Sequence, residues 1–321
     1  MTIALLGLGN LGSAVAQLIA TNGHAVMAWE HDEAVVDEVN RQHGNSRYLP
    51  GITLCDKVRA TNDISALLQQ ATVLVNCLPS RFIRQVLAPL AGRLPSHAVL
   101  VNMAKGINPA SRQTACQQLA ALFPDNPLVM VAGPSLANEF VRGINTVVVA
   151  ASADNAAARK VAGLLANDRF HVQLSADVRG VELGGILKNI YAIGLGAAHG
   201  QGQPGLNFVG AYLSQALAEM QRIGVALGAS SDSFYGFSGL GDLLATAMSE
   251  QSHNFRFGRL IGQGLSLAEA GKQTGLLPEG VNTLQVMSAI ADEQQLAVPL
   301  LQALQQLLEC GGDIRTFAGW Q

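Results

Sequence analysis

The chain has 321 residues, of which 49% are hydrophobic and 13% are charged, and its formal net charge is −3. This length is sufficient for two domains with large buried cores, and the charge balance gives no electrostatic basis for binding nucleic acid or an anionic membrane. The four cysteines are widely spaced and form no C-x-x-C pair, so we expect no metal site and a reduced, cytoplasmic protein.

The N-terminal residues predict a strand, a glycine-rich turn and a helix. Residues 2–6 form a short apolar run, which leads through a Gly-x-Gly-x-x-Gly motif into a helical stretch at residues 13–20. In a dinucleotide site, Gly7 permits the tight turn, Gly9 lets the backbone approach the pyrophosphate, and Gly12 permits close packing of helix and strand. The glycines also argue against a signal peptide. We therefore expect a cofactor pyrophosphate at the N-terminus of this helix.

A second predicted strand, residues 24–29, ends at Glu30. A carboxylate at this point accepts hydrogen bonds from the ribose hydroxyls of NAD and repels the 2′-phosphate of NADP. In the simpler interpretation, Glu30 is a solvated charge at the end of a strand. His31 could meet a phosphate, so we expect NAD as the cofactor and leave NADP open.

Strand-like and helical patterns alternate through the first half of the chain. Further strands are predicted at residues 71–77, 98–102, 128–132 and 146–150, with helices at residues 80–90 and 111–122 among them. This alternation is typical of a Rossmann-like α/β domain, in which helices cover both faces of a mostly parallel sheet.

After about residue 180 the strand signals largely stop. Helices are predicted at residues 206–227, 240–248, 266–274 and 281–293. We therefore expect a dinucleotide-binding domain at residues 1–180 and an all-helical substrate and dimerisation domain at residues 181–321. A substrate is expected where the domains meet, beyond the carboxyl ends of the strands.

Lys188 lies within an apolar, glycine-rich stretch at residues 186–202, together with Asn189 and His199. These polar residues indicate a buried helix rather than a membrane span. A buried lysine needs a partner or a task, and desolvation lowers its pKa towards the range that suits proton exchange with an alcohol or carbonyl oxygen. A lysine that extends to solvent is the simpler alternative, and we favour catalysis.

Two polar segments follow predicted strands. Lys105 comes after residues 98–102, where it could hold a phosphate or the cofactor, or be a surface lysine in a loop. Ser135, after Gly133, is expected to cap a helix, whose N-terminus would offer a second anion site. An ordinary helix cap explains Ser135 equally well.

Three polar segments follow in the second half. Asp242 lies at a predicted helix start, where it could be an N-cap, pair with Lys188 or bind a substrate hydroxyl, and Thr246 shares its face. Glu279 could cap the next helix or reach the cofactor. Donors that could close on a phosphate are Ser252, His253 and Asn254.

Together these segments resemble the bacterial type of NAD(P)-dependent glycerol-3-phosphate dehydrogenase, almost from end to end. The matching segments are residues 45–51, 79–80, 105–106, 133–139, 182–189, 218–220, 239–243 and 279–281. The resemblance implies a homodimer that reversibly reduces dihydroxyacetone phosphate to sn-glycerol 3-phosphate for phospholipid synthesis, with Lys188 as proton donor and acceptor. It implies substrate contacts at Lys105, Gly133, Ser135, Asp242, Ser252, His253 and Asn254. It implies cofactor contacts at Asn10, Leu11, His31, Lys105, Ala137, His253, Leu277 and Glu279.

The chain departs from the family pattern where the phosphate is expected. The family has an arginine at the position of His253 and usually a basic residue at the position of Val209, and Ser214-Gln215 replaces a usual Thr-Arg pair. Histidine is shorter than arginine, has fewer donors and is mostly neutral at pH 7. Two alternatives therefore stay open: a divergent dehydrogenase for another small hydroxy or keto compound, and a non-catalytic cofactor-binding protein.

Overall fold

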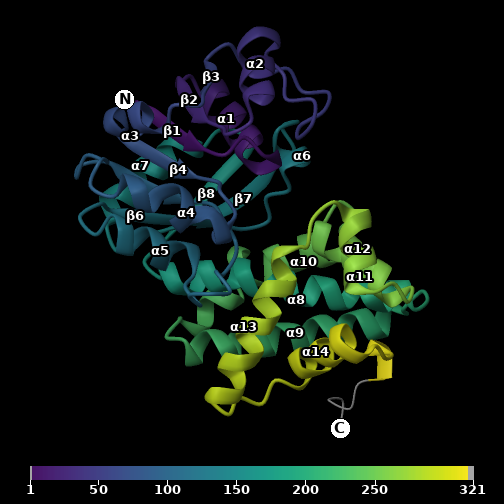
Figure 1. Cartoon of the computed structure of the whole chain (residues 1–321). Coiled ribbons are helices and arrows are strands. Elements are labelled where there is room, and N and C mark those ends of the chain that lie inside the picture. The colour runs from purple at the N-terminus through teal and green to yellow at the C-terminus, as the bar shows by residue number, and fades with distance from the viewer. Residues whose placement is uncertain (1, 317–321) are drawn as a thin grey trace. The chain divides into compact units, whose positions relative to one another are not determined.

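The computed structural model describes residues 2–316, which fall into two units (Figure 1). The sheet unit contains the chain up to Ala104 together with Thr114–Val178. The helical unit contains Lys105–Gln113 together with the chain from Arg179 onward. The segment Lys105–Gln113 thus belongs to the helical unit, although its neighbours on both sides in the sequence belong to the sheet unit.

One sheet organises the sheet unit, with the strand order β3-β2-β1-β4-β5-β6-β7-β8. The strands are β1 (Ile3–Leu6), β2 (Val26–Trp29), β3 (Val58–Thr61), β4 (Val73–Asn76), β5 (Val99–Asn102), β6 (Leu128–Ala132), β7 (Thr146–Ala151) and β8 (Phe170–Ser175). Neighbouring strands are parallel except for β6 and β7, which are antiparallel. The predicted mostly parallel sheet is therefore confirmed.

Both faces of this sheet are buried, which explains its nearly continuous apolar strands. Along β1, Ile3 and Leu5 join one apolar cluster, whereas Ala4 and Leu6 join another. This alternation follows from the two-residue period of side chains in a strand. The helices of this unit are α1 (Asn10–Thr21), α2 (Glu33–Gln42), α3 (Ile64–Gln70), α4 (Ile83–Leu87), α5 (Ala115–Leu122), α6 (Ala137–Phe140) and α7 (Asn155–Leu165), with single turns η1 (Ser80–Phe82) and η2 (Ala88–Leu90).

Two predicted helices of the sheet unit differ from the observed ones. The helix expected at residues 111–122 begins only at Ala115, because Thr114 and Gln117 form a capping box at that point. The helix expected at residues 80–90 is divided into η1, α4 and η2, and Pro89 lies in the first turn of the last piece.

The helical unit consists of helices and short helical turns, and its described residues include no strand. This confirms the predicted all-helical second half. The helices are α8 (Val178–Gly200), α9 (Leu206–Ala226), α10 (Asp242–Ala247), α11 (His253–Gly262), α12 (Leu267–Thr274), α13 (Glu279–Glu293) and α14 (Pro299–Cys310), with shorter turns η3 (Ser231–Phe234), η4 (Phe237–Gly241) and η5 (Ile314–Thr316).

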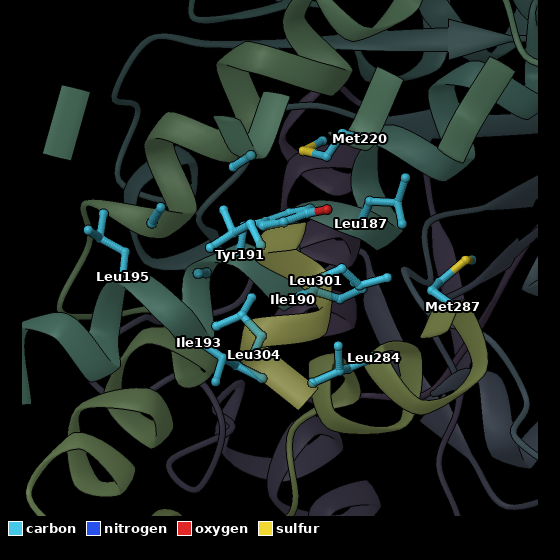
Figure 2. Close-up of a cluster of buried hydrophobic side chains, with 14 of the residues drawn as sticks. Leu187, Ile190, Tyr191, Ile193, Leu195, Met220, Leu284, Met287, Leu301 and Leu304 are labelled. Atoms are coloured by element: carbon cyan, nitrogen blue, oxygen red, sulfur yellow. The ribbon is translucent and has the colours of Figure 1, made fainter. Parts of the chain in front are cut away.

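Helix α8 is the centre of the apolar core of the helical unit. Its residues from Gly180 to Ala198 are buried, and side chains of α9, α13 and α14 pack in the same cluster. Figure 2 shows this cluster, with labelled side chains Leu187, Ile190, Tyr191, Ile193, Leu195, Met220, Leu284, Met287, Leu301 and Leu304. A lysine on this helix is therefore inside protein, as predicted.

No helix within residues 2–316 has both the length and the apolar character needed to cross a membrane.

Candidate active site

The glycine turn between β1 and α1 has a backbone that only glycine fits at two positions. Gly7 has φ of 89°, and a Cβ at Gly12 would lie 1.8 Å from the Gly7 carbonyl oxygen. Helix α1 begins at Asn10, and its N-cap residue Gly9 provides no side-chain cap. A Cβ at Gly9 would meet no atom within 4 Å. The turn thus leaves room for a ligand beside uncapped helix N–H groups, which fits a dinucleotide pyrophosphate.

Two asparagines hold the surroundings of this turn. Asn45 is 1% exposed, and its Nδ2 donates to the Leu8 carbonyl oxygen (2.7 Å) and to Ser13 Oγ (2.8 Å). Asn10 Nδ2 donates to the Tyr48 carbonyl oxygen (2.7 Å). The sequence does not show that Asn45 is buried against the turn, so its role is visible only in the structure.

Glu30 is part of the same assembly and is not a solvated charge. It is 4% exposed, and its Oε2 accepts a hydrogen bond from the Leu8 N–H (2.8 Å). Its Oε1 accepts from the His31 N–H (2.8 Å) and lies 2.5 Å from His31 Nδ1. The carboxylate at the end of β2 therefore connects directly to the glycine turn, while the His31 ring extends into solvent.

The segment after β6 differs from the prediction. The Ser135 hydroxyl donates to the Gly133 carbonyl oxygen (2.9 Å), and α6 begins at Ala137 with Leu136 as its N-cap. The prediction that Ser135 caps this helix is therefore wrong. Gly133 is required by packing, because a Cβ there would lie 2.9 Å from the Val147 carbonyl oxygen of β7.

In the helical unit, one aspartate brings two lysines together. Lys188 of α8 is 6% exposed, and its Nζ donates to Asp242 Oδ1 (2.5 Å) and to Thr246 Oγ1. Lys105 Nζ donates to Asp242 Oδ2 (2.7 Å). The predicted pair of Lys188 and Asp242 is confirmed, and the alternative that Lys188 extends to solvent is wrong. The side chain of Lys105, which lies in a loop, is 17% exposed and contacts Asp242. Asp242 is not an N-cap, because it is the first residue of α10 and Gly241 precedes it as the cap.

This cluster changes the protonation of Lys188. Burial lowers the pKa of Lys188 to about 8, with Asp242 opposing the change and the charge of Lys105 adding to it. An ammonium group with a pKa near neutrality can both donate and accept a proton under physiological conditions. The cluster therefore has the chemistry of a general acid and base.

The start of α11 lies against α8 and α13. Ser252 caps α11 through Oγ, which accepts from the Phe255 N–H (3.3 Å). Asn254 Nδ2 donates to Asn189 Oδ1 (3.0 Å), and Asn254 Oδ1 accepts from the Gly280 N–H (3.2 Å). Asn254 thus connects three helices, and Asn189, which we gave no role from the sequence, is its partner on α8.

His253 follows the cap residue of α11. Burial lowers the pKa of His253, and the charge of Arg256 lowers it further. The imidazole is therefore mostly neutral at pH 7, unlike an arginine at the same position. A phosphate near it would receive hydrogen bonds but little positive charge.

The remaining predicted cofactor residues lie in separate parts of the two units. In the sheet unit, Leu11 of α1 packs against the apolar core, and Ala137 is buried at the start of α6. In the helical unit, Leu277 is 38% exposed before α13, and Glu279 is the first residue of α13. The prediction that Glu279 caps α13 is wrong, because Pro278 is the cap residue and the helix has no side-chain cap.

No group of three or more His, Cys, Asp or Glu residues that could hold a metal ion occurs within residues 2–316.

Comparisons with known families cover nearly the whole chain. The family model described as NAD-dependent glycerol-3-phosphate dehydrogenase N-terminus matches residues 2–158. The model described as NAD-dependent glycerol-3-phosphate dehydrogenase C-terminus matches residues 177–318.

Individual proteins that are similar to this chain have the same family name. The chain is 41% identical over 308 residues to a glycerol-3-phosphate dehydrogenase (NAD(P)+) of Pseudomonas entomophila, covering 95% of this chain and 89% of that protein. It is 37% identical over 309 residues to the enzyme of the same name from Lysinibacillus sphaericus, covering 95% and 91%. The crystal structure of glycerol-3-phosphate dehydrogenase from Coxiella burnetii is similar with a TM-score of 0.91 at 30% identity, covering 98% of this chain and 96% of that one.

Proposed function

We propose that this chain, which belongs to the NAD-dependent glycerol-3-phosphate dehydrogenase family, reversibly reduces dihydroxyacetone phosphate to sn-glycerol 3-phosphate. The observation that carries the proposal is the buried contact of Lys188 with Asp242 and Thr246, in a chain that also has a dinucleotide turn. A bound nicotinamide dinucleotide supplies or accepts the hydride. The protein must bind both reactants and move one proton.

The sheet unit has the residues that would hold the cofactor. The glycine turn fits the pyrophosphate, and the contacts proposed there are Gly7, Gly9, Asn10, Leu11 and Gly12. Glu30 Oε2 accepts one hydrogen bond, from the Leu8 N–H, and its second lone pair can accept from a ribose hydroxyl. We expect NAD as the preferred cofactor, because this buried carboxylate repels a 2′-phosphate. The further cofactor contacts proposed by family resemblance are His31, Lys105, Ala137, His253, Leu277 and Glu279.

Lys188 would transfer the proton. An ammonium group has three N–H bonds, and Asp242 and Thr246 accept two of them, which leaves one for the substrate oxygen. In the reduction, the Nζ–H bond breaks and the proton goes to the oxygen of the carbonyl as the hydride reaches its carbon. In the oxidation, neutral Lys188 takes the proton from the hydroxyl. Asp242 stabilises the ammonium form of Lys188 and fixes the orientation of its N–H bonds.

The substrate contacts, which we propose from family resemblance, lie in both units. They are Lys105, Gly133, Ser135, Asp242, Ser252, His253 and Asn254. Lys105 contributes the charge, and it is close enough to Asp242 to share that carboxylate with Lys188. The neutral imidazole of His253 favours a second candidate, a dehydrogenase on the same frame whose substrate has a less charged end.

We also propose that the protein is a cytoplasmic homodimer. The four cysteines are thiols rather than disulfides, as expected in a reducing compartment. Large apolar side chains on the helical unit are exposed, including Leu206 at 86%, Met248 at 64% and Val225 at 48%. A subunit interface that covers such residues would account for them, and light scattering of the purified protein measures the dimer directly.

Replacement of Lys188 by alanine tests the proposed function. We expect Lys188→Ala to lower kcat for NADH-dependent reduction of dihydroxyacetone phosphate by about 10²–10⁴-fold, which is the usual contribution of a general acid. The matched control is Lys272→Ala, which removes an exposed lysine of the same unit and should leave kcat unchanged. Full activity of Lys188→Ala would refute the proposed proton transfer, and an inactive wild-type protein would refute the proposed substrate.

A further inference from the structure

A short segment between β5 and α5 enters the helical unit and returns. This segment, Lys105–Gln113, is here called the strap. The residues on either side of it, Ala104 and Thr114, belong to the sheet unit. The chain therefore enters the helical unit at Lys105, one of the two lysines on Asp242.

Contacts at both ends and in the middle fasten the strap to the rest of the helical unit. Lys105 Nζ donates to Asp242 Oδ2 at 2.7 Å. Ile107 is 2% exposed and belongs to the apolar core around α8. At the far end, Arg112 Nη1 lies 2.6 Å from Glu293 Oε1 of α13, but both side chains are about half exposed. Because the exposed pair of Arg112 and Glu293 contributes little, Ile107 is the principal anchor of the strap beyond Lys105 itself.

Asn108 closes the rest of the strap on itself. Its N–H donates to the Gln113 carbonyl oxygen (2.9 Å), and its own carbonyl oxygen accepts from the Arg112 N–H (2.8 Å). Its Oδ1 accepts from the N–H groups of Ala110 (3.0 Å) and Ser111 (3.2 Å). This asparagine-centred turn gives the strap a defined conformation of its own.

We propose that Ile107 and Asn108 are positioning residues, which hold the Lys105 ammonium group against Asp242 from within the helical unit. Ile107 is two residues from Lys105, so its burial fixes the backbone from which the lysine extends. When this backbone is already fixed, formation of the ion pair costs only the side-chain entropy of the lysine and no further backbone entropy. The strap therefore favours formation of the pair between Lys105 and Asp242.

This arrangement has a kinetic consequence that rests on the proposed function. With Lys105 in place, its charge helps to keep the pKa of Lys188 low. Without the charge of Lys105, Asp242 would interact with Lys188 alone, and the pKa of Lys188 would rise. A loosened strap should therefore weaken substrate binding and move the pH dependence of the reaction upward, beyond a simple loss of stability.

The test measures the reactivity of Lys105 directly, by competitive acetylation with acetic anhydride and mass spectrometry of the intact, folded protein. In Ile107→Ala and in Asn108→Ala, Lys105 should be acetylated several-fold faster relative to exposed Lys272 in the same sample. The matched control is Ile223→Ala, which truncates a fully buried isoleucine of the same core on α9. Ile107→Val is the milder variant if Ile107→Ala does not fold.

Unchanged acetylation of Lys105 in the folded strap variants would overturn the proposal. An equal increase in Ile223→Ala would also overturn it, because the effect would then reflect general loosening of the core. In kinetic assays, the strap variants should show a several-fold higher KM for dihydroxyacetone phosphate and an upward shift of the pH profile, with a smaller change in kcat. The acetylation result does not depend on turnover, so an inactive wild-type protein would refute the proposed function without deciding this inference.

Discussion

At the residue scale, the centre of the proposed site is a carboxylate that two ammonium groups share. Asp242 is 1% exposed, and each of its oxygens accepts from a different lysine. Burial of charges is tolerated when each has a partner, and removal of one partner leaves the others uncompensated. The arrangement thus gives a cationic site whose proton donor has a pKa near neutrality.

Glu30 gives a prediction about cofactor choice. Because its buried carboxylate lies beside the glycine turn, the wild-type protein should have at least about a tenfold higher kcat/KM with NADH than with NADPH. Glu30→Gln removes the charge and keeps the shape, so this ratio should fall. Glu33→Gln, which removes an exposed charge at the start of α2, should leave the ratio unchanged. A ratio near one in the wild-type protein would show that another group sets the preference.

His253 gives a prediction about the phosphate end of the substrate. His253→Arg replaces a mostly neutral imidazole by a permanent charge with a forked set of donors, so KM for dihydroxyacetone phosphate should fall by about tenfold or more. His97→Arg adds the same charge at an exposed site of the sheet unit and should not change KM. If KM of the folded His253→Arg variant does not fall, the substrate phosphate does not bind at this position.

At the scale of elements, glycines place α8 and α11 in direct backbone contact. A Cβ at Gly258 of α11 would lie 1.9 Å from the Ile193 carbonyl oxygen, and one at Gly196 of α8 would lie 2.1 Å from the Phe255 carbonyl oxygen. This contact sets the register in which Asn254 meets Asn189, the neighbour of Lys188. The glycine content of α8 is thus a packing requirement.

Alanine substitutions at two helical glycines should have opposite effects on stability. Gly258→Ala forces the two helix backbones apart and should lower the free energy of unfolding by about 1–3 kcal/mol. Gly210→Ala, on α9, adds a methyl group that meets no atom within 4 Å, so it should raise stability by about 0.5–1 kcal/mol. Urea unfolding measures both, and a stabilised Gly258→Ala variant would contradict the described packing.

A buried carboxylate also fixes the last long helix. Glu219 of α9 accepts hydrogen bonds from the N–H groups of Leu300 (2.7 Å) and Leu301 (2.9 Å) at the start of α14, and from the Tyr191 hydroxyl of α8 (3.1 Å). Burial raises the pKa of Glu219, while these donors oppose the rise. The carboxylate therefore caps α14 from another helix and ties it to the helix that contains Lys188.

The sequence predicted elements where the apolar pattern was strong and missed those where it was mixed. The central strands β1, β4 and β5 are nearly continuous apolar runs, because both of their faces are buried. The missed strands, β3 and β8, are at the two ends of the sheet order and alternate buried with more exposed residues. A half-exposed edge strand lacks the apolar run on which the prediction depended.

Within the site, the sequence indicated which residues matter more reliably than what they contact. The pairing of Lys188 with Asp242 was one of several alternatives, since the two residues are 54 positions apart. Local caps were less predictable, because the Ser135 hydroxyl can bond to Gly133 instead of the next helix. The place of Lys105 in the helical unit could not be predicted, because it lies between a predicted strand and a predicted helix, as connecting segments throughout the sheet unit do.

At the scale of the whole molecule, the two units contain different parts of the proposed chemistry. The sheet unit has the glycine turn and Glu30, which fit a dinucleotide. The helical unit has Lys188, Asp242, Thr246 and Lys105, which can hold and exchange a proton. Lys105 follows β5 in the sequence, and the strap places it beside Asp242 in the helical unit.

The pH dependence of kcat/KM in both directions of the reaction tests the central claim most directly, because it requires turnover and reports the proton donor of the free enzyme. Lys188 has a pKa lowered to about 8, so it must be protonated for the reduction and neutral for the oxidation. Reduction of dihydroxyacetone phosphate should therefore fall as the pH rises above about 8, and oxidation of glycerol 3-phosphate should rise through the same pH and then level off. The account would be contradicted if kcat/KM changed in the same direction with pH for reduction and for oxidation, or if the change occurred near the ordinary pKa of lysine. It would also be contradicted if the protein bound NADH but showed no turnover.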